Sequence, residues 1–246
     1  MNKIRRFHRR QTILTWLTVF LLVLLQLQLL PVMSVNDSQP VASNTDPAKA
    51  TVQANYGKLP LAFEPNQGQV DGKASFLVHH GQATTYFDGV NTTTSIGDDH
   101  ITMSLDGANT PNFTGTDQLE SKTNYFIGND QSKWHSDVPN YKSLLAKNVY
   151  PGIDLRYYGT NSQLEHDFIV SPGTDYKQIA FHFDGQQDLS LDKDGNLVLK
   201  LASEELHLNA PTTYQQTTNS KHTIPSQFNL KGNSVTLALN ADYDHL

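Results

Sequence analysis

Short runs of β-branched and aromatic residues recur along most of the chain at intervals of about 10 residues, and helical periodicity is nearly absent. Turn signals separate the runs, among them Asp106-Gly107, Pro151-Gly152, Pro172-Gly173 and Asp184-Gly185. The pattern predicts an all-β fold, an antiparallel β-sandwich of many short strands, because half-buried strands bury their apolar faces by packing sheet on sheet. One short helix is predicted near Tyr141–Lys147. The expected strands cover 75–79, 83–87, 92–96, 100–105, 122–127, 153–158, 163–170, 178–183, 188–192, 197–201, 204–208, 213–216, 223–230 and 234–240.

Alternation over 153–170 predicts one hairpin in register. A four-residue loop, 159–162, would pair Tyr157 with Leu164 and Arg156 with Glu165. One face is then apolar and buried, and it carries Ile153, Leu155, Tyr157, Leu164, His166 and Phe168. A second hairpin is predicted over 188–201, where the loop 193–195 pairs two leucines with two others, Leu191 with Leu197 and Leu189 with Leu199.

The amino-terminal 34 residues differ from the rest of the chain. Five basic residues stand before an apolar run over 13–30, which Pro31 ends, and this is the pattern of a secretory signal peptide. The run is also close to the length of a membrane span, so a hydrophobic signal-anchor helix is the alternative. Residues 35–54 predict a disordered linker, and the β-sandwich domain is expected over 55–246. We therefore expect a secreted or cell-surface protein, whose only contact with the membrane is through 13–30 if the signal is not cleaved.

Charge and composition narrow the function classes. Without its first 34 residues the chain keeps 13 Lys and Arg against 24 Asp and Glu, a formal net charge of −11. Such acidity argues against nucleic acid as a partner, because phosphate contacts need a basic face. The chain has no cysteine, which excludes disulfides, thiolate zinc sites and a cysteine nucleophile.

The candidate site residues lie near the first hairpin. Glu165 and Asp167 are two residues apart on one expected strand, so both face the same way. Paired carboxylates can perform acid–base chemistry on glycosides, and Tyr158 and Trp134 could stack against a sugar. The simpler interpretation is an ion pair with Arg156 on an open, solvent-facing sheet surface.

Other chemical motifs are missing or explained by turns. No nucleotide-binding glycine motif, no serine-nucleophile motif and no zinc-binding histidine motif occurs, so we assign no catalytic residue, no metal ligand and no cofactor. Residues 192–196 resemble the start of a calcium loop, but Leu197 and Ser203 occupy its sixth and twelfth places, and a hairpin turn accounts for the same residues. His79 and His80 should point to opposite faces, and His166 and His182 are interpreted as core histidines with hydrogen-bond partners.

Several motifs in a fixed order carry a family resemblance: Leu59–Gln69 (LPLAFEPNQGQ), Asn124–Asp130 (NYFIGND) with Ser132–Trp134 (SKW), Val149–Leu155 (VYPGIDL) and Leu164–Val170 (LEHDFIV). They resemble the domain of unknown function that precedes SBBP-type β-propeller repeats in bacterial exported proteins. The resemblance spans about Leu59 to Tyr243 and implies a β-rich surface module without established catalytic residues. The family usually has Tyr where this chain has His166. A propeller blade needs roughly 40 residues, and none follow the domain in this sequence, so we expect a stand-alone, truncated or split version.

Two function classes follow. The first is a non-catalytic, exported module with a structural or adhesive role and a cell-surface protein or glycan as partner. The alternative is a carbohydrate-binding or carbohydrate-active domain that uses Tyr158, Glu165, Asp167 and Trp134. A concave groove lined by aromatic residues and convergent carboxylates would favour the second class.

Overall fold

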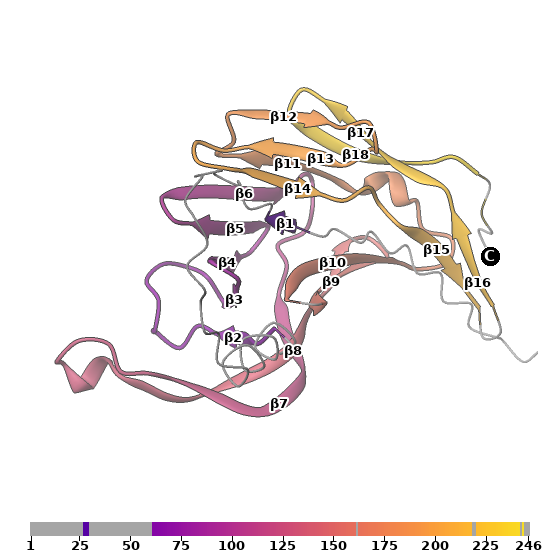
Figure 1. Ribbon diagram of the computed structural model, residues 1–246. Helices are drawn as coiled ribbons and strands as arrows, with labels where there is room; N and C mark the ends of the chain where they lie inside the picture. Colours follow the sequence, from indigo (N-terminus) through magenta and orange to yellow (C-terminus); the bar gives the residue numbers. More distant parts are fainter. Residues whose placement is uncertain (1–26, 30–60, 161, 218–219, 242, 244–246) are drawn as a thin grey trace, which may run out of the picture.

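The computed structural model describes residues 27–29, 61–160, 162–217, 220–241 and 243 (Figure 1). This part of the chain is all-β and antiparallel, as predicted, and contains no α-helix. Two single-turn 3₁₀ helices, η1 (Gln131–Lys133) and η2 (Tyr176–Gln178), interrupt the strands. Over the described residues there is no helix with the length and apolarity that a membrane span requires.

Most strands belong to one main sheet with the order β10-β9-β8-β2-β3-β4-β5-β6-β11-β18-β17, and β7 pairs with β8 beside this path. A small sheet has the order β1-β14-β13-β12, and β15 pairs only with β16. The strand bounds are β1 Leu27–Leu29, β2 Phe63–Pro65, β3 Phe76–His80, β4 Ala83–Asp88, β5 Asn91–Ile96, β6 Asp99–Leu105, β7 Phe113–Tyr125, β8 His135–Tyr150, β9 Ile153–Thr160, β10 Gln163–Val170, β11 Ala180–Asp184, β12 Asp188–Leu191, β13 Leu197–Lys200, β14 Glu205–Leu208, β15 Thr213–Gln216, β16 Lys221–Ile224, β17 Ser226–Lys231 and β18 Ser234–Leu239.

The main sheet and the small sheet share one apolar core. Phe87 packs edge-on against Phe113 and Tyr157, with ring centroids 5.5 and 4.9 Å apart, which is the arrangement that aromatic rings prefer. Leu199 and Leu206 of the small sheet belong to the same buried cluster. Burial of this surface is the main favourable term for folding, and it fixes β9 and β10 against the rest of the domain.

The first predicted hairpin forms, with its register moved by two residues. Ile153, Leu155, Leu164 and Phe168 are buried, as predicted. Thr160 pairs with Gln163, so the connection has two residues instead of the predicted four. Two-residue connections with positive φ match the twist of paired strands, and Ser162 has a φ of 64°. A shift of two keeps every side chain on its predicted face, because side chains alternate with period two.

The second predicted hairpin has the predicted register: Leu191 pairs with Leu197, and Leu189 pairs with Leu199. Asp192 organises the loop, since its Oδ1 accepts hydrogen bonds from the backbone N–H groups of Asp194 and Asn196 at 2.8 and 2.9 Å. The calcium-like sequence is therefore explained by a turn, as expected.

The predicted helix near Tyr141–Lys147 is wrong. These residues lie within β8, which pairs with β7 on one side and with β9 on the other. Leu, Ala and Lys have a high intrinsic helix propensity, but this propensity amounts to only roughly a few tenths of a kcal/mol per residue. Strand pairing on both edges of β8 outweighs it. Of the expected strand over 122–127, residues 122–125 form the end of the longer β7, whereas 126 and 127 lie beyond it.

The expected signal or anchor helix and the expected linker over 35–54 fall outside the described residues, except for Leu27–Leu29. These three residues form the extended strand β1, whose register with β14 pairs Leu27 with Leu208 and Leu29 with Leu206. This short part of the apolar run is therefore a strand and not a helix.

Candidate functional site

Glu165 and Asp167 lie side by side on one face of β10, and this face was predicted correctly. The register places Tyr158 opposite Glu165 and Arg156 opposite Asp167. The predicted solvent exposure is wrong, because Glu165 is 1% and Asp167 5% exposed. The predicted ion pair between Arg156 and Glu165 is also replaced, since the Arg156 guanidinium lies 3.8 Å from the Asp117 carboxylate.

Burial changes the acid–base behaviour of the pair. It raises the pKa of Asp167 to about 7, although a hydrogen bond from Tyr158 and the charge of Arg156 act in the opposite direction. The Tyr158 hydroxyl donates to Asp167 Oδ1 at 3.0 Å. Burial, followed by the charges of Asp167 and Glu165, raises the pKa of the Tyr158 phenol. Asp167 is thus a carboxyl group that exchanges its proton near neutral pH beside a hydroxyl donor.

The hairpin β15–β16 places Tyr214 and Lys221 near enough to Asp167 for their charges to interact. The Lys221 ammonium lies 3.5 Å from the centre of the Tyr214 ring, a cation–π contact. The charge of Lys221 lowers the pKa of Asp167, whereas burial and then Asp167 raise the pKa of Tyr214. We call Tyr158, Glu165, Asp167, Tyr214 and Lys221 the carboxylate cluster. Alternation within 153–170 could not reveal the influence of an element that lies more than 40 residues later in the chain.

Access to the two carboxyl groups is restricted, because Glu165 and Asp167 are both buried. A cavity of about 60 Å³ lies between the main and small sheets, and a cavity of about 460 Å³ lies beside Tyr176. Neither cavity is lined by Glu165 or Asp167. Acid–base catalysis on a sugar requires the substrate to contact both carboxyl groups, so the carboxylate cluster would have to open first.

His166 occupies the core-facing side of β10, as predicted, and lines the 60 Å³ cavity. Its ring lies between Tyr157 and Phe168, at centroid distances of 5.2 and 5.6 Å. Burial lowers the pKa of His166 to about 3, so the imidazole is neutral. The expectation of a fully hydrogen-bonded histidine is wrong, because Nε2 has no partner among the described residues. The remaining lining is mainly apolar and consists of Thr92, Thr94, Ile101, Met103, Leu164, Phe183, Leu199, Leu206 and Leu208 besides the residues already named.

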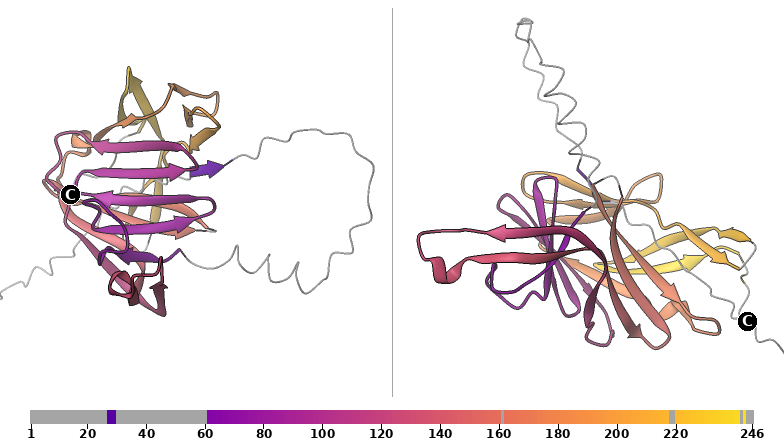
Figure 2. Two further views of the ribbon diagram at one scale, coloured as in Figure 1. Left: turned by 90° about the vertical axis from the view of Figure 1, so that its left-hand side faces the viewer. Right: turned by 90° about the horizontal axis from the view of Figure 1, so that it is seen from below.

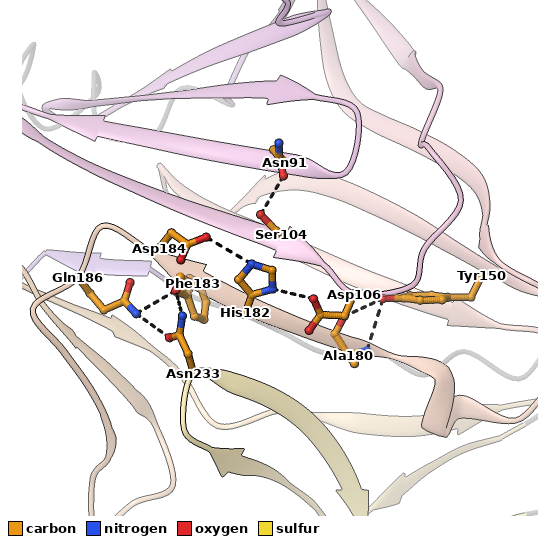
Figure 3. A network of polar contacts seen from close by, with 10 residues as sticks. All are labelled: Asn91, Ser104, Asp106, Tyr150, Ala180, His182, Phe183, Asp184, Gln186 and Asn233. Atoms are coloured by element: carbon orange, nitrogen blue, oxygen red, sulfur yellow. Dashed lines mark hydrogen bonds and ion pairs between the residues drawn. The ribbon is translucent and has the colours of Figure 1, made fainter.

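His182 is half-buried and held by two carboxylates (Figure 3). Its Nδ1 lies 2.7 Å from Asp106 Oδ1, and its Nε2 lies 3.3 Å from Asp184 Oδ2. Tyr150 donates to the carbonyl of Ala180 at 2.7 Å in the same network. Both ring nitrogens are therefore engaged, as expected, but the expected core position is wrong, because the His182 side chain is 33% exposed.

The histidines do not assemble a metal centre in the part of the chain that is described. Nowhere in it do three or more His, Cys, Asp or Glu side chains converge in a way that could hold an ion. His79 and His80 point to opposite faces of β3, as predicted, and only His80 is buried. The His80 ring lies 2.8 Å from the Thr85 hydroxyl, and burial lowers the pKa of His80 to about 4.

Trp134 lies apart from the other predicted site residues, at the end of the β7–β8 hairpin. This hairpin, here called the arm, extends away from the body of the domain (Figures 1 and 2). Nine residues of extended strand separate Trp134 from Ser143, which pairs with Tyr158, and this corresponds to roughly 30 Å. Trp134 therefore does not combine with Tyr158, Glu165 and Asp167 in one sugar site.

Trp134 instead belongs to an exposed apolar cluster with Phe126 and Ile127, which we call the arm tip. The exposed fractions are 60% for Phe126, 68% for Ile127 and 37% for Trp134. The rings of Phe126 and Trp134 pack edge-on, with centroids 5.2 Å apart. Sequence reasoning placed Phe126 and Ile127 in an ordinary strand, because apolar residues are expected inside a domain. The turn signal Gly128-Asn129-Asp130, which directly follows these two residues, correctly indicates that the chain reverses there.

Internal hydrogen bonds fix the shape of the arm tip. The Trp134 indole N–H donates to the carbonyl of Gly128 at 3.2 Å. The Asp130 carboxylate accepts from the backbone N–H and the hydroxyl of Ser132, at 3.1 and 2.6 Å, and begins η1. Directly before the arm tip, Tyr125 donates to the buried Glu64 of β2 at 2.6 Å. The apolar side chains are thus held outward by an ordered turn.

The comparison with known proteins gives a family and no function. A family model described as "Domain of unknown function (DUF7948)" matches residues 63–246. No curated protein and no solved structure matches the chain. The matched range contains the arm, the carboxylate cluster and the inter-sheet cavity, and the match shows no association with SBBP repeats. Because the matched range is well over half of the chain, the protein belongs to this family of domains of unknown function.

Proposed function

We propose that this protein is an exported or surface-tethered β-sandwich module with a non-catalytic, adhesive role, and that the arm tip is its contact element. The exposed cluster of Phe126, Ile127 and Trp134 carries the proposal. Exposed apolar residues are common singly, but a cluster held outward at the end of a projecting element is typical of an interaction site. Export is supported by the basic and apolar pattern of 1–34, and a place ahead of β-propeller repeats is the role that the sequence resemblance implies.

The arm has the properties of a preorganised binding element. Large aromatic side chains dominate binding energies at interfaces, and a rigid turn loses little conformational entropy when it binds. The internal bonds of Trp134 and Asp130 supply that rigidity. The body of the domain serves as the support, because Thr123 and Tyr125, at the end of β7 next to the arm tip, donate hydrogen bonds to Glu64 of β2.

Attachment of bacterial cells that export the full chain tests this function. Cells carrying the wild-type chain are compared with cells carrying Phe126→Ser/Ile127→Ser for adherence to glass, polystyrene and a cell layer. Leu191→Ser is the matched control, because Leu191 is 40% exposed on the separate β12–β13 hairpin. We expect the double variant alone to lose adherence. Equal adherence of all three strains, or retention of the full chain in the cytosol, would contradict the proposal.

A carbohydrate site at Tyr158, Glu165 and Asp167 is the second candidate. It is favoured by two adjacent buried carboxyl groups with a tyrosine hydroxyl 3.0 Å from one of them. A glycan screen with wild type, Glu165→Gln and Asp167→Asn tests it. A specific glycan that binds the wild type and neither variant, while all three remain folded, would promote this candidate. Identical glycan profiles for the three proteins would reject it.

A further inference from the structure

We propose that the partner of the arm tip is a lipid bilayer with zwitterionic headgroups, into which Phe126 and Ile127 insert while Trp134 lies at the headgroup level. This inference rests on the proposed function, because it names the partner of the same contact element. It follows from the exposed area, the charge and the internal hydrogen bonds of the arm tip.

The exposed area of the arm tip suits a bilayer better than a protein partner. With whole side chains of about 150–250 Å² each, the exposed fractions of the three residues amount to roughly 300 Å². A stable protein–protein interface needs about 800 Å² on each side. A bilayer sets no such minimum, because apolar side chains at a convex end can enter it without a complementary surface.

The charge of the turn suits zwitterionic lipid. Between Phe126 and Trp134 the only charged side chains are Asp130 and Lys133, which give a net charge of zero. An anionic membrane surface attracts clusters of several Lys and Arg, and the arm tip has no such cluster. The long Lys133 side chain can reach a headgroup phosphate while its stem stays on the apolar side.

Two polar side chains of the turn, Trp134 and Asp130, are hydrogen-bonded within the turn itself. The indole N–H of Trp134 bonds to Gly128, and the carboxylate of Asp130 bonds twice to Ser132. Insertion therefore does not leave these groups without hydrogen bonds, which would be costly in an apolar medium. Tryptophan is also the residue that is enriched where hydrocarbon meets headgroups.

The expected binding is weak and reversible. Roughly 300 Å² corresponds to about ten methylene groups at about 30 Å² each. This is somewhat less than a myristoyl chain, which alone gives an association constant on the order of 10⁴ M⁻¹. The arm tip would thus act as a second contact for a protein that is already held at a surface, and not as its sole anchor.

Quenching of Trp134 by brominated lipid tests the inference. The chain has two tryptophans, so Trp16→Phe in the full chain leaves Trp134 as the only one. The protein is mixed with phosphatidylcholine vesicles at millimolar lipid, with and without bromine on the upper acyl chain. We expect a blue shift and a loss of emission of about twofold or more with bromine, since the indole would lie near the headgroups. Local quenching reports the arm even if residues 13–30 also bind the vesicles.

Two variants in the same background provide the comparison. Phe126→Ser/Ile127→Ser should reduce the quenching about tenfold or abolish it, because most of the inserted apolar area is removed. Leu191→Ser should leave the quenching unchanged. Near-ultraviolet circular dichroism verifies that each variant is folded.

The inference and the adhesive function can fail separately. Unquenched Trp134 in the wild-type arm overturns the bilayer inference, and cross-links between the arms of two copies would then assign the arm tip to self-association. If the adherence of cells still depends on Phe126 and Ile127, the adhesive function stands with a partner other than lipid. If adherence does not depend on these residues while Trp134 is quenched, the bilayer inference stands and the adhesive function falls.

Discussion

The buried carboxyl group of Asp167 should make the effect of Asp167→Asn depend strongly on pH. Asparagine nearly matches aspartate in shape, and its side-chain oxygen can still accept the hydrogen bond from Tyr158. It does not titrate. The difference in the free energy of unfolding between variant and wild type therefore reports the ionisation of this one carboxyl group.

The sign and size follow from the raised pKa of Asp167. The pKa rises from 3.8 to about 7 on folding, so the folded state binds more protons between these values. The contribution of the protonated group to stability is complete below about pH 4 and is lost as the pH rises through about 7. At about 1.4 kcal/mol per pKa unit, the wild type loses up to about 4 kcal/mol over this range, and the asparagine variant loses none of it.

Urea unfolding at half-unit pH steps from 4 to 8 measures the difference. We expect the stability of Asp167→Asn relative to wild type to rise with pH, with most of the change between pH 4 and 7. The titrations of His80 and His166 act in the opposite direction in both proteins and so cancel in the difference. Asp137→Asn is the control, because Asp137 is 72% exposed in its pair with Lys122 and such pairs contribute about 0–1 kcal/mol. A difference that stays flat or falls with pH for Asp167→Asn would refute the reasoning.

Three further predictions concern the core, the sheet and the amino terminus. His166→Phe removes the unpartnered Nε2 beside the 60 Å³ cavity and should stabilise the domain by about 1–3 kcal/mol at pH 7, seen as a higher urea midpoint at constant slope; a lower midpoint would contradict this. Gly115→Ala places a methyl group against the Tyr141 ring and should destabilise the domain by about 1–3 kcal/mol, measured as a lower thermal midpoint. An unchanged midpoint would contradict this and show that β7 and β8 separate easily. Terminal sequencing of exported protein distinguishes a start near Val35 from a retained anchor. Cleavage before Val35 would remove β1 and leave β14 as the edge strand of the small sheet. Recovery of the protein only from the cytosol would refute export.

The sequence by itself determined the features that depend on neighbouring residues. Alternation and turn residues identified the all-β class, the faces of β9 and β10 and the full register of β12 and β13. These features are local, because side-chain period and turn geometry are set within about ten residues. The two-residue error at β9–β10 arose where two loop lengths satisfied the same alternation, and it left every face unchanged.

Only the tertiary structure decided what each face meets. The sequence pattern around Glu165 and Asp167 is typical of an open sheet surface, yet both residues are buried. In the distant hairpin β15–β16, the charge of Lys221 lowers the pKa of Asp167, and the charge of Asp167 raises the pKa of Tyr214. Residues 141–147 have helical preference, yet they lie in a strand that is paired on both edges. Phe126 and Ile127 are core residues by composition, yet the arm holds them in solvent. In each case the deciding contacts, or their absence, involve segments far apart in the chain, and a local pattern of polar and apolar residues carries no information about those.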